Sequence, residues 1–235
     1  MEKKDKLTNY AIILASGTGS RFGAGVAKQF LKIDNKTLLE YTIENFQNCR
    51  KIDKIIITVS EDNIQNTQNL LTNKYDKLYK IVKGGCTRQE SAFNALNAID
   101  DTEANVLIHD GARPFTNENI INECIKHLDS GIKALTTAID SADTIVKVED
   151  NKILSMPERQ TLKRVQTPQG FKLSVIKQAH ELAAKDNYNY TDDCGIIVKN
   201  NLAEVFVIKG DNDNIKITYP QDLELAKQII KKRES

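Results

Sequence analysis

Two cations stand seven residues apart in a Gly-rich segment near the N-terminus, Arg21 and Lys28. Gly17 and Gly19 precede them and directly follow the apolar run of residues 10–15. Glycines lack a Cβ, so their backbone N–H groups can approach an anion closely, and the two cations can neutralise part of a polyphosphate. The segment therefore predicts a loop that binds a phosphate chain. A surface loop with incidental charges could have the same sequence pattern.

Two common phosphate-binding loops do not fit this segment. A dinucleotide fingerprint, G-x-G-x-x-G, needs its third glycine three residues after the second and an acid about 20 residues further on. Here Gly23 comes one residue late, and Glu61 lies about 40 residues on. The Walker A pattern, G-x-x-x-x-G-K-[ST], is absent. An NAD-dependent oxidoreductase is therefore disfavoured.

Two later segments carry similar groups. In "GGCTRQES", Gly85 is followed by Arg88 and Ser91, which suit close approach of a flat base and hydrogen bonding to its edge. In "IHDGARPF", Asp110 can hold Mg²⁺ or a hydroxyl, and Arg113 can bind a phosphate bidentately. The simpler alternatives are a strand-to-helix turn in the first segment and a local ion pair in the second.

The elements that position these groups follow an alternating pattern. Apolar runs rich in β-branched residues predict strands at 10–15, 54–60, 79–85, 105–110, 133–139 and 203–210. Amphipathic runs predict helices at 36–49, 62–75, 88–99, 117–128, 173–185 and from about 220. Thr37 and Glu40 can form a capping box at the start of the first of these helices. This alternation predicts an α/β fold with a mostly parallel sheet and helices on both faces. Ligands bind at the carboxyl ends of such strands, so three of the loops should form one site.

Length and composition limit the classes of protein. The 235 residues suit a single domain, 1–235, with a β-hairpin arm at about 140–160. Net charge is +1, so nothing predicts nucleic-acid binding, and no apolar run approaches a signal peptide or membrane span. Four scattered cysteines and the absence of a histidine cluster favour a cytoplasmic protein without disulfides.

Four further positions are less informative by themselves. Thr191, in "NYTDDCG", suits either the N-cap of the next helix or a ligand contact. Arg159 opens "RQTLKRVQTPQGF", in which Pro168 restricts the backbone after Thr167. Lys216 is expected in a short strand before the last helix.

Taken together, these motifs resemble the 2-C-methyl-D-erythritol 4-phosphate cytidylyltransferase family. The resemblance covers residues 9–230 and rests on "LASGTGSRFG", "KQF", "GGCTRQES", "HDGARPF", "DTI", "RVQTPQGF", "TDD" and "DNIKIT". It implies a Rossmann-like nucleotidyltransferase architecture of the GT-A-like type with a protruding β-arm. Ribitol-5-phosphate cytidylyltransferases share most of these motifs, so D-ribitol 5-phosphate remains the alternative substrate.

The resemblance implies roles at the matching positions. The catalytic cations would be Arg21, Lys28 and Lys216. The nucleotide CTP would be bound by Ala15, Gly17, Gly19, Gly85, Arg88, Ser91 and Thr167. The polyol phosphate would be bound by Asp110, Arg113, Thr144, Arg159 and Thr191, and Asp110 would also bind Mg²⁺ or another divalent cation. The arm would bring Thr144 and Arg159 to a second subunit of a homodimer.

Three positions depart from the usual family pattern. Ser16 stands where Ala or Gly is usual, and Ala27 replaces the Pro that often precedes the lysine. Cys86 stands where Asp or another polar residue is common, which affects the expected base and ribose contacts.

The implied reaction explains why the sequence has no convincing nucleophile–His–acid set. A phosphate monoester is largely dianionic at neutral pH, so it is a nucleophile without a general base. Catalysis then depends on positioning two polyanions and stabilising charge at the phosphates. A regulatory module that binds nucleotide without catalysis is the alternative from another class, and the presence of both loop cations and Asp110 argues against it.

Overall fold

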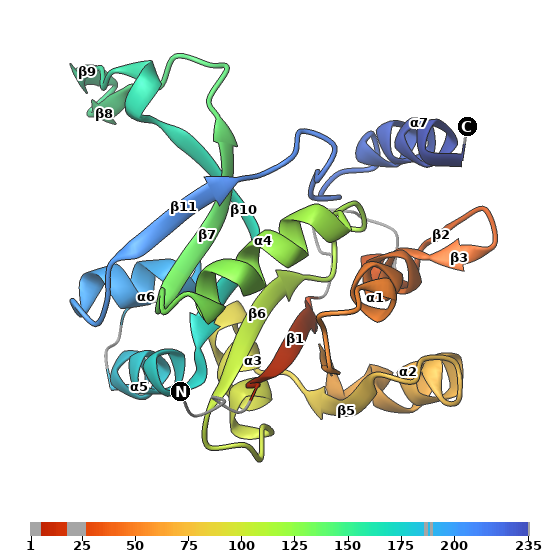
Figure 1. The fold of residues 1–235 in the computed structure, drawn as a ribbon. Coiled ribbons are helices and arrows are strands. Elements are labelled where there is room, and N and C mark those ends of the chain that lie inside the picture. The colour runs from red at the N-terminus through yellow and green to blue at the C-terminus, as the bar shows by residue number, and fades with distance from the viewer. Residues whose placement is uncertain (1–5, 18–26, 186–187, 189, 235) are drawn as a thin grey trace.

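The computed structural model describes residues 6–17, 27–185, 188 and 190–234 (Figure 1). The strands are β1 (Thr8–Ala15), β2 (Lys32–Ile33), β3 (Lys36–Thr37), β4 (Lys54–Val59), β5 (Leu78–Lys83), β6 (Ala104–Asp110), β7 (Ala134–Asp140), β8 (Lys147–Glu149), β9 (Lys152–Ser155), β10 (Lys163–Lys172) and β11 (Val205–Lys209). The α-helices are α1 (Leu38–Asn48), α2 (Ile64–Leu71), α3 (Arg88–Asn97), α4 (Glu118–Asp129), α5 (Leu173–Ala183), α6 (Asp193–Lys199) and α7 (Asp222–Glu234). Within these residues, no helix is both long and apolar enough to cross a membrane.

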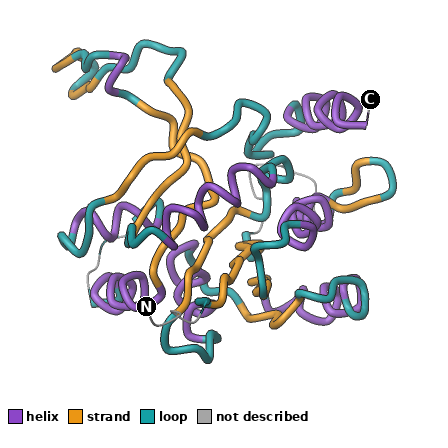
Figure 2. Tube along the Cα trace, viewed as in Figure 1, coloured by secondary structure: helices purple, strands orange, loops and turns teal. Residues whose placement is uncertain are grey.

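The central sheet of the described chain has seven strands, in the order β11-β7-β10-β6-β1-β4-β5. Neighbouring strands are parallel except where β10 pairs, because β10 is antiparallel to both β6 and β7. Helices cover both faces of the sheet (Figures 1 and 2). The predicted α/β fold with a mostly parallel sheet is confirmed.

Alternate side chains of each central strand enter different cores. Ile13 and Ile57 pack on one face against α1 and α4, whereas Ile12 and Ile56 pack on the other against α3 and α5. Side chains of a strand point alternately to the two faces, so a strand covered on both faces must be apolar at every position. This explains why the runs that predict these strands are continuously apolar.

The strand β10 is the largest element that the sequence analysis does not predict. Its segment contains Pro168 and Gly170, which normally argue against a central strand. The pairing of β10 with β7 shifts register between Gln166 and Gln169, so Pro168 lies in an irregularity where its missing N–H breaks no regular ladder. A Cβ at Gly170 would lie 3.0 Å from the side chain of Leu135, so glycine fits the close approach there.

Helix α1 both confirms its predicted cap and supports a loop after β6. The Thr37 side chain and Glu40 form the expected capping box. Further along α1, Thr42 Oγ1 donates to the carbonyl of Gly111 at 3.0 Å, and Asn45 Nδ2 donates to the carbonyl of Pro114 at 2.9 Å. The turn that begins at the end of β6 is therefore tied to the neighbouring helix.

Two short strands, β8 and β9, pair antiparallel and project from the ends of β7 and β10, away from the central sheet (Figure 1). Asp150 and Asn151 at their tip have φ of 48° and 61°, the left-handed values that a two-residue hairpin turn needs. The hairpin and its flanks expose large apolar side chains: Ile145, Val148, Ile153, Leu154 and Met156. No described part of the chain covers them.

Candidate active site

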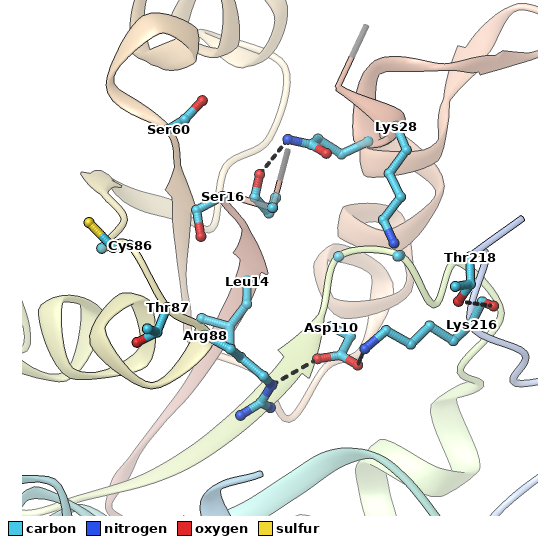
Figure 3. Close-up of a pocket in the computed structure, with 16 residues that line it drawn as sticks. Leu14, Ser16, Lys28, Ser60, Cys86, Thr87, Arg88, Asp110, Lys216 and Thr218 are labelled. Carbon is cyan, nitrogen blue, oxygen red and sulfur yellow. Dashed lines mark hydrogen bonds and ion pairs between the residues drawn. The ribbon is translucent and has the colours of Figure 1, made fainter. Parts of the chain in front are cut away.

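A pocket of about 480 Å³ opens at the carboxyl ends of β1, β4, β5 and β6 (Figure 3). It is lined by Leu14, Ala15, Ser16, Gly17, Lys28, Gln29, Ser60, Gly85, Cys86, Thr87, Arg88, Asp110, Gly111, Ala112, Lys216 and Thr218. Parallel strands end at the same edge, so loops from distant parts of the chain meet there. Three loops that the sequence predicts to share one site do so.

The two sides of this pocket differ in charge. Ser16, Ser60 and Thr87 line one side with neutral hydroxyl groups, whereas Lys28 and Lys216 lie on the other, with Asp110 beside Lys216 (Figure 3). Arg88 lies below the hydroxyl groups and reaches toward Asp110. A nucleotide has the same division into a neutral base and a charged phosphate chain. The pocket therefore suits a nucleotide whose phosphates lie toward the lysines.

Asp110 stands at the centre of the charged side. Its Oδ1 accepts from Arg88 Nε at 3.2 Å and its Oδ2 accepts from Lys216 Nζ at 2.8 Å. Arg113 Nε lies 3.7 Å from Oδ2. Burial alone would raise the pKa of this carboxyl, but the Arg88 and Lys216 cations outweigh burial and hold it well below its usual range. Asp110 is therefore a carboxylate at neutral pH that orients two cations.

Arg88 also reaches a second buried carboxylate, from helix α6. Its Nη1 donates to Asp193 Oδ2 at 2.6 Å, and Asp193 Oδ1 accepts from His180 Nε2 at 3.0 Å. Burial by itself would raise the pKa of Asp193, but the Arg88 charge and the His180 hydrogen bond outweigh burial, so the pKa lies below its usual value. Asp193 is fully buried, so it acts from behind the pocket by holding Arg88 in place.

His109, next to Asp110, is buried beneath the same turn. Thr167 Oγ1 accepts from the Asp110 N–H at 3.0 Å, so its own proton goes to His109 Nδ1, also at 3.0 Å. His109 Nε2 then donates to the carbonyl of Arg113 at 2.9 Å, because a carbonyl can only accept. Burial lowers the pKa of His109 to about 4, which agrees with a neutral ring. The neutral ring ties the two ends of the Asp110–Arg113 turn together.

This buried histidine predicts a specific loss of stability in weak acid. The unfolded chain takes up a proton near the ordinary pKa of 6.5, whereas folded His109 does so only near 4. The free energy of unfolding should therefore fall by roughly 3 kcal/mol as the pH drops from 6.5 to 4. Urea unfolding at several pH values measures this slope. His109→Gln should flatten it, and a His109→Gln slope equal to that of the wild-type protein would contradict the assignment.

Lys28 and Lys216 reach the pocket from opposite ends of the chain. Lys28 lies in a short 3-10 helix, and its Nζ donates to the carbonyl of Ile217 at 3.0 Å. Lys216 does not lie in the short strand expected from the sequence, since residues 215–218 have no regular structure. Instead, the Ile217 N–H donates to the carbonyl of Ala112 at 2.8 Å, and this bond brings the Lys216 segment to the site.

The other expected residues divide into four groups. Ala15, Gly17, Gly85, Arg88 and Asp110 line the pocket, and Ser91, Arg113 and Thr167 contact residues that line it or their immediate neighbours. Thr144, Arg159 and Thr191 are exposed and do not line it. Gly19 and Arg21 lie outside the described residues.

Thr191 is not the N-cap of α6. Asp192 has that position, and its side chain accepts from the N–H of Gly195 at 2.9 Å. An aspartate one residue nearer the helix satisfies the same free N–H groups, which leaves Thr191 without this structural role. Of the two alternatives for Thr191, the N-cap is wrong, and the ligand contact stays a prediction.

The sequence analysis names Ser16 only as a departure from the family pattern, and it misses several other residues of the site: Gln29, Ser60, His109, Thr218 and the pair His180–Asp193. His109 and Asp193 stand beside recognised positions in "HDGARPF" and "TDD", which is the only signal they carry. Gln29 donates to the carbonyl of Ala15 at 2.6 Å and so joins two segments of the pocket wall.

Comparison with known families identifies the family to which this chain belongs. The model of the 2-C-methyl-D-erythritol 4-phosphate cytidylyltransferase family matches residues 10–232. The chain belongs to this family.

Individual relatives match this chain over nearly the whole of its length. A 2-C-methyl-D-erythritol 4-phosphate cytidylyltransferase of Clostridium perfringens is 40% identical over 94% of this chain and 98% of its own. A crystal structure of the 4-diphosphocytidyl-2C-methyl-D-erythritol synthase of Anaerococcus prevotii has a TM-score of 0.86 at 30% identity and covers 96% of each chain. A bifunctional ribulose 5-phosphate reductase/CDP-ribitol pyrophosphorylase of Haemophilus influenzae is 37% identical over 97% of this chain and 49% of its own.

The number of carboxylates in the pocket limits how the protein could hold a divalent cation. Asp110 is the one acid among the described residues that line the pocket. Arg88 and Lys216 occupy two of the roughly four lone-pair positions on this carboxylate. No group of three or more His, Cys, Asp or Glu residues in the described chain could hold a metal. Mg²⁺ commonly combines one or two carboxylates with substrate phosphates and water, so the donors fit a cation that arrives on a triphosphate.

Proposed function

We propose that this chain joins CTP and 2-C-methyl-D-erythritol 4-phosphate to form 4-diphosphocytidyl-2-C-methyl-D-erythritol and pyrophosphate. One observation carries the proposal: in a chain of this family, the pocket at the strand ends combines a neutral wall with Lys28 and Lys216. Such a pocket accommodates the base and the phosphates of one nucleotide. The reaction would supply isoprenoid precursors, and we propose that it takes place in the cytoplasm.

The chemistry needs positioning more than acid–base catalysis. A phosphate oxygen of the polyol phosphate forms a bond to the α-phosphorus of CTP, the bond from that phosphorus to the bridging oxygen breaks, and its electron pair leaves with pyrophosphate. The polyol phosphate is largely dianionic at neutral pH, so no side chain has to remove a proton from it. Lys28 and Lys216 would stabilise the negative charge that develops on the phosphates, together with Arg21 from the Gly-rich loop.

The remaining expected residues have complementary roles in this proposal. Gly17 and Gly19 would present backbone N–H groups to the triphosphate. A bound Mg²⁺ would neutralise charge on the phosphate oxygens, and Asp110 would be its protein ligand. Arg88, fixed between two carboxylates, would orient Asp110 and Lys216 rather than bind phosphate itself.

The polyol phosphate would be bound at the open side of the pocket. Arg113, whose guanidinium is held by the carbonyl of Asn214, is one candidate for contact with it, and Thr191 is another. Thr144 and Arg159 lie in the segments that flank the β8–β9 hairpin. Because they do not line the pocket of their own chain, we propose that they complete the site of a second subunit in a homodimer.

The exposed apolar side chains of the hairpin support this dimer and provide its test. Exposed apolar patches commonly mark interaction surfaces. The double variant Ile153→Asp, Leu154→Asp should shift the protein from dimer to monomer in sedimentation velocity, because it places two carboxylates in an apolar contact. The control Val198→Asp changes an exposed apolar residue on α6. A monomeric wild-type protein, or a hairpin variant that remains dimeric, would contradict the proposal.

The alternative substrate is D-ribitol 5-phosphate, in a reaction that makes CDP-ribitol for wall or capsule polymers. The observation that favours it is the 37% identity with the CDP-ribitol pyrophosphorylase of Haemophilus influenzae. Measurement of pyrophosphate release with CTP and Mg²⁺ separates the two, with each polyol phosphate at equal concentration. We expect strong preference for 2-C-methyl-D-erythritol 4-phosphate. Preference for D-ribitol 5-phosphate would show that it is the substrate instead. Absence of pyrophosphate release with either compound would refute cytidylyl transfer.

A further inference from the structure

Ser16 and Ser91 form a hydrogen-bonded pair on the neutral side of the pocket. Their Oγ atoms lie 2.7 Å apart, although the two residues come from the end of β1 and the first turn of α3. Ser91 is fully buried, whereas Ser16 is partly exposed and lines the pocket beside Cys86 and Thr87 (Figure 3). Of the two residues, Ser16 lines the pocket and Ser91 does not.

The hydrogen bonds of Ser91 determine where both protons lie. Ser91 Oγ is 2.8 Å from the carbonyl of Thr87 and 3.5 Å from that of Gly85. Both can only accept, so the single proton of Ser91 goes to a carbonyl, the nearer being that of Thr87. Ser91 Oγ also accepts from the N–H of Gly85 at 3.1 Å. Its second lone pair then accepts from Ser16. The Ser16 hydroxyl has thereby donated its proton and presents only lone pairs to the pocket.

The backbone around Ser16 keeps this hydroxyl in place. A Cβ added at Gly84 would lie 2.4 Å from Ser16 Cβ and 2.8 Å from its Oγ. The backbone directly after β5 therefore passes close to this side chain, and only a glycine there leaves room for it. A hydroxyl that is held in place and already bonded discriminates between ligand donors and acceptors, whereas a freely rotating one can serve either.

We propose that Ser16 is a residue that selects a pyrimidine with an exocyclic amino group over one with a carbonyl at the same position. Cytosine presents an N–H donor there, and uracil presents an acceptor that would face the Ser16 lone pairs. This inference rests on the proposed function, since it assigns the neutral side of the pocket to the base of the nucleotide. It gives a role in base selection to Ser16, an uncharged side chain that lies away from both lysines.

The test compares CTP with UTP in binding and in turnover. Ser16→Ala should weaken CTP binding about 3- to 10-fold in titration calorimetry and leave UTP binding unchanged or slightly stronger, because it removes one neutral hydrogen bond. The ratio of kcat/KM for CTP to that for UTP should fall by the same factor. Thr218→Val is the matched control, since Thr218 lines the same pocket beside Lys216. It should leave the ratio unaltered.

A second variant tests the direction of the hydrogen bond. Ser91→Ala removes the acceptor for the Ser16 proton, so Ser16 can then donate to the uracil carbonyl and UTP binding should improve relative to CTP. In the Ser16→Ala background, Ser91→Ala should leave the ratio unchanged, because the two residues act as a unit. Thermal unfolding of each variant checks that the fold is retained.

The outcomes separate this inference from the proposed function. A wild-type protein that binds and turns over CTP, together with a Ser16→Ala variant whose CTP-to-UTP ratio changes less than about twofold, overturns the role of Ser16 alone. A wild-type protein that binds neither nucleotide and releases no pyrophosphate overturns the proposed function and the role of Ser16 with it. A reduced ratio in Ser16→Ala that is absent in Thr218→Val supports both.

Discussion

Lys28→Ala should lower kcat/KM for pyrophosphate release by about 100-fold or more while the protein remains folded. The loss of one preorganised group that stabilises charge in a transition state typically costs this much. Lys28 reaches the charged side of the pocket, and its Nζ is directed by the carbonyl of Ile217. In the proposed reaction, its removal takes one cation away from the triphosphate, and a water molecule cannot replace that charge. Steady-state assays of pyrophosphate release measure the effect.

The matched control is Lys32→Ala, four residues along the chain. Lys32 is exposed on β2 and does not line the pocket, so its replacement should change kcat/KM by less than about twofold. Near-normal turnover in Lys28→Ala, or an equal loss in both variants, would refute the role assigned to Lys28. Far-ultraviolet circular dichroism and thermal unfolding show whether each variant is folded.

Asp193→Ala should be the most destabilising single change in the buried charge network. It removes the acceptor for both Arg88 and His180 and leaves the guanidinium with one carboxylate partner in place of two. Removing one partner of a buried ion pair commonly costs about 3–5 kcal/mol, because the remaining charge is uncompensated. Urea unfolding at pH 7 measures the change in free energy. The activity should fall as well, since Arg88 no longer holds Asp110 in a fixed position.

Asp140→Ala provides the comparison for an exposed pair. Asp140 pairs with Lys163 at the surface, where solvent screens the charges, so its loss should change the free energy of unfolding little. Asp193→Asn keeps one hydrogen bond and should fall between the two. If Asp193→Ala unfolds at the same urea concentration as Asp140→Ala, the buried network does not stabilise the protein as inferred.

The depressed pKa of Asp193 also sets the sign of the pH dependence. A carboxyl whose pKa is lower in the folded state stabilises the protein fully above its unfolded pKa and loses that effect as the pH falls through its folded value. Wild-type protein should therefore lose this contribution only below about pH 4. Asp193→Asn should show a smaller acid-dependent decrease in stability over the same range.

Much of the fold can be predicted because its signals are local. The run of residues 10–15 is apolar at every position, which requires burial on both faces whatever the partners are. The Thr37–Glu40 capping box lies within four residues and forms as predicted. Strand β10 could not be predicted in this way, because Pro168 and Gly170 are acceptable only where a register shift and two facing leucines occur.

The location of the site was predictable for a geometric reason. Strands that run parallel all end at one edge, so the groups after β1, β5 and β6 had to meet there. The contacts of those groups were not predictable. Arg88 and Asp193 are 105 positions apart, and Lys28 and Ile217 are 189 apart. No local pattern contains such pairs.

The amino-acid sequence by itself determined most of the strands and helices of the sheet domain, the family and the edge of the sheet at which the expected site residues meet. These features depend on residue type and on neighbours within one or two turns of the chain. The tertiary structure decided which acids are charged, which proton His109 carries and which way Ser16 donates. Those properties depend on burial and on partners far away in sequence, because a buried polar group takes its state from whichever groups surround it in space.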